Sequence, residues 1–150
     1  MSIGGRLIRD AQDFVDKVAI KKIQDFRKPS FGKGEVGTLH GERSDADGYK
    51  FLRITMFGSP KIKSVKGCAL EFQSKSGTIK CSSDTKDIES EYSETLSKGI
   101  TEFEIYLDDE LYQALKKPVT SVTVTFPKRL FGKEVCSFEI HSKVFAKFIK

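Results

Sequence analysis

The spacing of apolar residues changes once along the chain, and this change limits the folds that the chain can adopt. Near the N-terminus apolar residues recur at intervals of three and four, which is typical of one face of a helix. These residues are Leu7, Ile8, Ala11, Phe14, Val15, Val18 and Ala19. Beyond residue 49 apolar and polar residues alternate instead, which is typical of strands. We therefore predict a long helix over about residues 5–26, followed by a chain rich in strands.

Short alternating segments separated by turns carry the strand prediction. The clearest are residues 50–57 and 122–126. The apolar residues on either side of Ser76-Gly77 predict a hairpin, in which Cys81 lies opposite Phe72 or Leu70 according to the length of the loop. In neither register does Cys81 face Cys68, so we expect no disulfide between them.

The last third of the chain contains two similar units, each a strand followed by a short amphipathic helix. The first unit comprises residues 103–106 and 111–115, and the second comprises residues 138–141 and 144–148. Asp108 is a natural N-cap for the first short helix because its carboxylate can accept from a free backbone N–H.

These patterns predict an α+β fold, with residues 1–150 as a single domain. The N-terminal amphipathic helix packs on a mainly antiparallel sheet of about six strands, forming a roll, and a β-sandwich with an attached helix is the alternative. We expect a glycine-rich loop at about 29–41 and a β-rich region at about 49–150. The glycines at 32, 34 and 37 have the spacing of the glycine-rich motif that binds dinucleotides. In that motif a strand precedes the glycines, whereas here a helix does, so a flexible loop is the better interpretation.

Composition and targeting signals narrow the class of protein. No run of apolar residues approaches the roughly 20 that a membrane span needs. The N-terminal segment also lacks the uninterrupted apolar region of a secretory signal peptide, because it contains Asp10, Asp13 and Asp16. The three cysteines have no CxxC spacing, so neither a zinc site nor a disulfide framework is indicated. We expect a cytoplasmic protein without metal or cofactor. A mature secreted chain that has lost its signal is the alternative.

Candidate catalytic residues are few. His40 lies between glycines, and His141 lies on a strand face away from Cys136, so the two histidines form at most a weak polar site. Glu102 and Glu104 alternate with apolar residues, which indicates the wet face of a strand rather than an acid–base pair. We therefore predict no catalytic residue, although an enzyme is not ruled out by the sequence.

Charge is unevenly distributed along the chain. Residues 84–110 contain ten acidic residues and only two basic ones, Lys86 and Lys98, which gives a local charge of −8. Because the net charge is +5, the rest of the chain carries +13. The densest acidic stretch, 84–94, lacks the glycine of a calcium loop and is interpreted as a solvated surface, although weak cation binding by this segment is left open.

A basic segment at 21–33 is the most distinctive candidate binding site. It contains Lys21, Lys22, Arg27, Lys28, Phe31 and Lys33, to which Lys61, Lys63 and Lys66 would add if they lie nearby. Cations neutralise phosphates and exposed aromatic rings stack on bases. Lysines outnumber arginines 20 to 6, however, which makes nucleic-acid recognition unlikely and leaves weak attraction to anions or a membrane surface.

Three functional hypotheses follow. The leading one is a non-enzymatic domain that binds a protein partner or forms a homo-oligomer through a sheet face or edge, because 12 Phe exceed what one small core needs. The first alternative is a roll that encloses a small apolar ligand between helix and sheet, and serves either to bind it or to act on it as an enzyme. The second is weak anion or nucleic-acid binding through residues 21–33.

Overall fold

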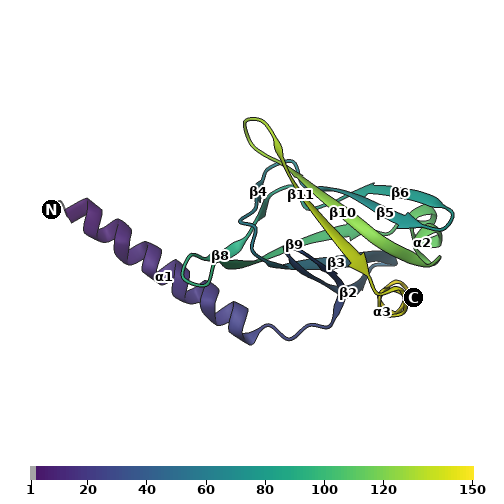
Figure 1. Cartoon of the computed structure of the whole chain (residues 1–150), viewed down its shortest axis with the longest axis horizontal. Helices are drawn as coiled ribbons and strands as arrows, with labels where there is room; N and C mark the ends of the chain where they lie inside the picture. Colours follow the sequence, from purple (N-terminus) through teal and green to yellow (C-terminus); the bar gives the residue numbers. More distant parts are fainter. Residues whose placement is uncertain (1–2) are drawn as a thin grey trace.

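The computed structural model describes the backbone of residues 3–150 and the side chains from Arg9 onward (Figure 1). The helices in this part of the chain are α1 (Ile3–Asp25), α2 (Asp109–Leu115) and α3 (Ser142–Ile149). The strands are β1 (Ser30–Gly34), β2 (Gly37–Ala46), β3 (Tyr49–Gly58), β4 (Lys63–Ser64), β5 (Ala69–Ser74), β6 (Gly77–Ser82), β7 (Ile88–Glu89), β8 (Glu91–Ser93), β9 (Lys98–Tyr106), β10 (Val119–Pro127) and β11 (Lys133–Ile140).

Nine of these strands form one curled antiparallel sheet, a half-barrel, in the order β6-β5-β10-β11-β1-β2-β3-β9-β8. β4 and β7 form a separate two-stranded sheet. The chain that leaves β6 then runs beside β9: Asp84 N donates to Glu104 O at 2.8 Å, and Glu104 N donates to Thr85 Oγ1 at 3.0 Å. This irregular segment satisfies the edge of β9, which would otherwise be open to pairing.

The concave side of the sheet holds a single hydrophobic cluster. Its inward residues alternate along each strand, as in Leu52, Ile54 and Met56 of β3. α2 and α3 cover one end of the half-barrel, where they bury Leu111, Leu115, Phe145 and Ile149 (Figure 1). Each short helix follows its strand directly, so both predicted strand–helix units are confirmed, as is the Asp108 N-cap, which accepts from Leu111 N at 2.8 Å.

The structure confirms the α+β class and the antiparallel sheet, but the predicted number of strands was too low. Nine strands, not about six, form the main sheet, and because it is one continuous sheet the alternative of a two-sheet sandwich is wrong. The hairpin register is the second one predicted, with Leu70 opposite Cys81. The three cysteines are free.

The predicted glycine-rich loop at 29–41 is wrong, because most of it forms β1 and the start of β2. Its glycines permit close backbone contact rather than flexibility. A Cβ on Gly34 would lie 2.1 Å from Ser137 O of β11, and a Cβ on Gly37 would lie 2.0 Å from Phe57 O of β3. Side chains at these positions would therefore force the neighbouring strands apart.

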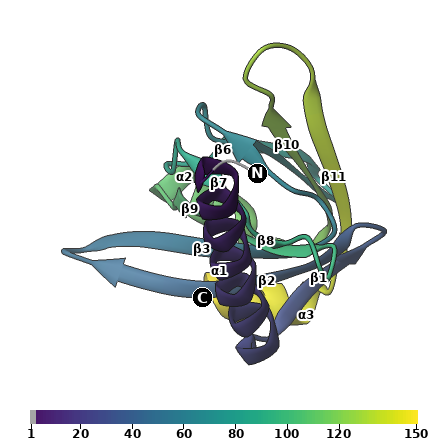
Figure 2. The same ribbon diagram turned by 90° about the vertical axis from the view of Figure 1, so that its left-hand side faces the viewer.

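The expected packing of the N-terminal helix across a face of the sheet is also wrong, because α1 meets the sheet at its β8 edge. α1 lies outside the half-barrel, against β8 and the adjacent part of β9, and its N-terminal half extends beyond the strands (Figures 1 and 2). Within the described side chains of α1, only Ala19 and Ile23 are buried hydrophobic residues. No helix in the described part of the chain is long and apolar enough to cross a bilayer.

Candidate functional site

One side of the C-terminal half of α1 docks on the barrel. Ala19 and Ile23 are 3% and 9% exposed. Beside them Lys22 forms an ion pair with Glu91 of β8 at 2.6 Å, and Asp16 accepts from the Thr95 hydroxyl at 2.7 Å. The hydrogen bonds that Thr95 and Ser93 donate hold the pKa of Asp16 below its ordinary value. These polar contacts and the short apolar seam fix the helix against β8.

A second stripe of α1 carries apolar residues that nothing in the described chain covers. Phe14 is 68% exposed, Val15 is 61% exposed and Val18 is 40% exposed. Ala11 lies one turn before Val15 and is also exposed. Large apolar side chains that are exposed together on one helix face mark an interaction surface more often than an isolated exposed residue does. We call Ala11, Phe14, Val15 and Val18 the free stripe.

The free stripe borders an open groove of about 980 Å³ between α1 and the β7–β8 region. The opposite wall includes Tyr92 and Glu94 of the β8 turn, and Lys61. Lys61 donates to Glu94 at 2.8 Å, and this hydrogen bond raises the pKa of Lys61. The groove therefore has one apolar wall and one wall of paired charges, an arrangement that suits an amphipathic helix.

The predicted basic segment does not form one patch of free cations. Lys28 lies 3.3 Å from Glu42 and 3.9 Å from Glu102, while the Arg27 guanidinium donates to Gln24 O and Phe26 O within its own segment. Lys22 is paired with Glu91, as described above. Lys21 and Lys33 are exposed on different elements, α1 and β1.

Phe31, the aromatic member of that predicted site, is 1% exposed and packs on Phe145 and Phe148 of α3. It is therefore a core residue that a nucleic-acid base does not reach. Of the lysines that were expected to extend the site, Lys61 borders the groove beside α1, whereas Lys63 lies on β4 and Lys66 follows it.

His40 has structural partners on both ring nitrogens. Nδ1 lies 2.8 Å from Lys28 O, and because a carbonyl only accepts, Nδ1 carries the proton. Nε2 then accepts from the Thr38 hydroxyl at 2.7 Å. Burial lowers the pKa of His40, and the Phe26 ring packs edge-on against it at 4.6 Å. The imidazole thus links the segment after α1 to β2. It lines neither the groove beside α1 nor the hollow beside α2.

His141 has a local role in the backbone. It is the N-cap of α3, and its side chain accepts from Val144 N at 3.4 Å. The alternation predicted for β11 is confirmed, since Cys136, Phe138 and Ile140 are buried. The predicted place of His141 on this strand is wrong, because β11 ends at Ile140 and His141 begins the turn into α3. His40 and His141 therefore serve separate elements.

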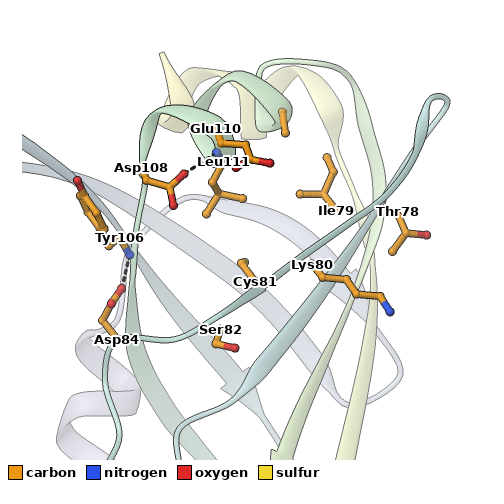
Figure 3. A pocket seen from close by; sticks show the side chains of 11 residues that line it. Thr78, Ile79, Lys80, Cys81, Ser82, Asp84, Tyr106, Asp108, Glu110 and Leu111 are labelled. Carbon is orange, nitrogen blue, oxygen red and sulfur yellow. Dashed lines mark hydrogen bonds between the residues drawn. The ribbon is translucent and has the colours of Figure 1, made fainter.

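A second hollow, of about 550 Å³, lies between β6, the end of β9 and α2 (Figure 3). Two of the three carboxylates that line it accept from backbone N–H groups: Asp84 accepts from Tyr106 N, and Asp108 caps α2. The third is Glu110, in the first turn of α2. Burial raises the pKa of the Cys81 thiol on its wall to about 12, so this thiol is not a thiolate nucleophile at neutral pH. Among the described residues no cluster of His, Cys, Asp and Glu could hold a metal ion.

The glutamates considered as an acid–base pair are explained by ion pairing. Arg53 of β3 lies 3.3 Å from Glu102 and 3.2 Å from Glu104 on the outer face of the sheet. Their role as a wet strand face, which alternation predicted, is confirmed.

Leu130 and Phe131 were not among the predicted site residues, yet they are 87% and 86% exposed at the tip of the β10–β11 hairpin. The sequence does contain a signal for them. Two large apolar residues stand between Pro127-Lys128-Arg129 and Gly132, in a segment typical of a turn, where polar residues are expected.

Comparisons with known proteins give no relative: no family model, no curated protein and no solved structure matches the chain.

Proposed function

We propose that this protein is a self-associating domain in which the free stripe of α1 pairs with the same stripe of a second copy. The observation that carries the proposal is the exposure of Phe14, Val15 and Val18 on a helix that projects from the barrel (Figure 2). Covering such a stripe removes apolar surface from water, which favours association.

The sequence of the stripe is self-complementary in an antiparallel pair. In heptad notation Ala11 and Val18 occupy a positions, Phe14 a d position, and Asp10 and Lys17 g positions. An antiparallel pair centred between residues 12 and 13 places Phe14 against Ala11 of the second copy, a large residue against a small one. By the same symmetry Asp10 lies beside Lys17 of the second copy, so two ion pairs flank the apolar seam.

The arrangement of α1 leaves room for this pairing. The helix has 23 residues, or about 35 Å, and among its described side chains the hydrogen bonds and ion pairs to the barrel come from Asp16 and Lys22, both in its C-terminal half. An antiparallel partner therefore places its barrel beside the N-terminal half of α1, where Figure 1 shows no strand of the first copy. Neither Asp10 nor Lys17 forms an ion pair with any residue whose side chain is described, so both are available.

Charge reversal tests the proposal and its register. Asp10→Lys alone, or Lys17→Asp alone, replaces two attractive pairs by two repulsive ones. Each attraction lost and each repulsion gained contributes about 0.2–0.5 kcal/mol. Because each single variant loses two attractions and gains two repulsions, it weakens the dimer about 4- to 30-fold. The double variant restores both pairs and returns the dissociation constant towards that of the unaltered chain. Sedimentation equilibrium over the micromolar to millimolar range measures all four proteins.

Each outcome is informative. A chain that stays monomeric up to millimolar concentration refutes self-association. If the protein dimerises but neither single reversal changes the dissociation constant, the free stripe is not the dimer interface. Single variants that weaken the dimer without rescue in the double variant refute the antiparallel register and point to a different partner geometry.

A further inference from the structure

The tip of the β10–β11 hairpin combines maximal apolar exposure with concentrated positive charge. Leu130 and Phe131 form its apex, and Lys128, Arg129 and Lys133 flank them. The turn is closed by a hydrogen bond from Lys128 N to Gly132 O at 3.0 Å, and Gly132 adopts a positive φ of 89°. The apex side chains are therefore presented by a defined turn at the end of a long hairpin, the loop at the top of Figures 1 and 2.

No acidic residue offsets this charge within the turn. Residues 127–133 contain three cations and no carboxylate, and none of the three forms an ion pair with the described residues. The next acidic residue, Glu134, alternates onto the same face as Cys136 and is half-buried. β4 contacts β10, and the residues that follow β4, Val65 and Lys66, are exposed. Lys63 of β4 lies opposite the carboxylate residue Glu89 in the β4–β7 pair.

The other long hairpin of the sheet provides a contrast. The tip between β2 and β3 carries Asp45 and Asp47, and its exposed aromatic residue, Tyr49, contacts the Tyr106 ring at 5.8 Å. The charges of the β2–β3 tip are balanced, because Arg43 forms an ion pair with Asp45 at 2.9 Å and Lys50 lies opposite Asp45 in the hairpin. Of these two tips, only the β10–β11 tip therefore combines apolar exposure with a net positive charge.

We propose that the β10–β11 tip inserts into the surface of an anionic lipid bilayer. Leu130 and Phe131 enter the boundary between headgroups and acyl chains, while Lys128, Arg129 and Lys133 contact the anionic headgroups. Interfacial insertion buries the apolar side chains and leaves the charged ends of the flanking residues in the headgroup layer. This function is distinct from, and does not depend on, the pairing of α1.

The shape of the tip favours a bilayer over a protein or nucleic-acid partner. A stable protein interface buries about 800 Å² on each side, which a five-residue turn alone does not supply. Single-stranded nucleic acid binds to a cationic groove lined by aromatic rings, whereas this apex is convex and one of its two apolar residues is the aliphatic Leu130. A bilayer receives a convex apolar apex without a complementary pocket.

The absence of Trp from the sequence makes a direct test possible. Phe131→Trp introduces a single fluorescent reporter at the apex of the full chain, and Tyr49→Trp introduces one at the β2–β3 tip as the matched control. The vesicles consist of phosphatidylcholine alone, or of phosphatidylcholine with roughly one third phosphatidylserine. We expect the Phe131→Trp emission to shift to the blue and to be quenched by bromine-labelled acyl chains only in the anionic vesicles, while the Tyr49→Trp emission does not change.

Vesicle sedimentation supplies the complementary measurement. Leu130→Ser with Phe131→Ser, and separately Lys128→Gln with Arg129→Gln, should each reduce binding about tenfold or more, with unchanged far-UV circular dichroism because these residues are exposed. Equal binding to neutral vesicles, or binding without a spectral shift of Phe131→Trp, would overturn the proposal. A chain that does not sediment with anionic vesicles at low salt would overturn it as well.

Discussion

Removal of the Phe14 side chain is the most direct test of the energetic argument for α1. Burying a whole Phe side chain contributes about 1.5–3 kcal/mol. Because Phe14 is 68% exposed in the isolated chain, covering it on association contributes about 1–2 kcal/mol. A symmetric pair contains Phe14 twice, so Phe14→Ala should weaken the dimer by about 2–4 kcal/mol, or about 25- to 700-fold in dissociation constant.

The same substitution should leave the fold of each chain intact. Phe14 contributes to no buried cluster, so the free energy of unfolding of the monomer should change by less than about 0.5 kcal/mol. Sedimentation equilibrium measures the association, and urea denaturation at low concentration measures the folding. Tyr49→Ala is the matched control, because it removes an aromatic side chain that is 55% exposed on a different surface.

Two results would refute the reasoning. If Phe14→Ala and Tyr49→Ala change the dissociation constant equally, the free stripe is not the interface. If Phe14→Ala lowers the stability of the monomer by more than about 1 kcal/mol, Phe14 packs within its own chain in solution and does not belong to a free stripe.

Two further predictions concern the barrel. Because burial lowers the pKa of His40 in the folded chain, the unfolded chain takes up a proton first as the pH falls; the free energy of unfolding should therefore decrease from about pH 6.5 downward. His40→Gln should flatten this slope in urea titrations between pH 7.5 and about 5.5, and an unchanged slope would assign the dependence to other groups. Gly34→Ala places a Cβ 2.1 Å from Ser137 O and should lower the free energy of unfolding by more than about 3 kcal/mol. In Gly48→Ala the Cβ meets nothing within 4 Å, but the φ of +83° is strained for alanine, so this variant should lose only about 1–2 kcal/mol. Equal losses of stability in the two variants would show that β1 can shift away from β11.

The sequence was a good guide where the signal is local. Alternation in residues 50–57 and 122–126 predicted β3 and β10, and the Asp108 cap predicted the start of α2, because each pattern depends on neighbours in the chain. The missed strands are those whose pattern is weak. β1 and the start of β2 contain several glycines, which lower strand propensity, and their place in the sheet is specified by close approach to β3 and β11.

The position of α1 depends on long-range contacts that periodicity does not contain. Its apolar stripe predicted a helix that a sheet should cover, but Phe103 and Phe126 already fill the concave face together with the other inward residues of the sheet. The helix instead docks through Ala19 and Ile23, at the end of the stripe, with polar contacts from Asp16 and Lys22. Apolar periodicity therefore identified the helix correctly and its partner incorrectly.

The two exposed apolar surfaces share a cause in the architecture of the half-barrel. α2 and α3 cover one end, so the apolar residues of that end are buried (Figure 1). Away from α2 and α3, the short β4–β7 pair packs against β10 and β9 and places Ile62 and Ile88 in the core. Both α1 and the β10–β11 tip project from the side of the molecule that lies away from α2 and α3 (Figure 1). Burial of Leu130 and Phe131 against their own barrel would require the hairpin to bend back over the core, and the regular pairing from Ser121–Glu139 to Pro127–Lys133 holds it extended. No described part of the chain covers the apolar apex of this hairpin, which is why we assign its cover to a bilayer surface.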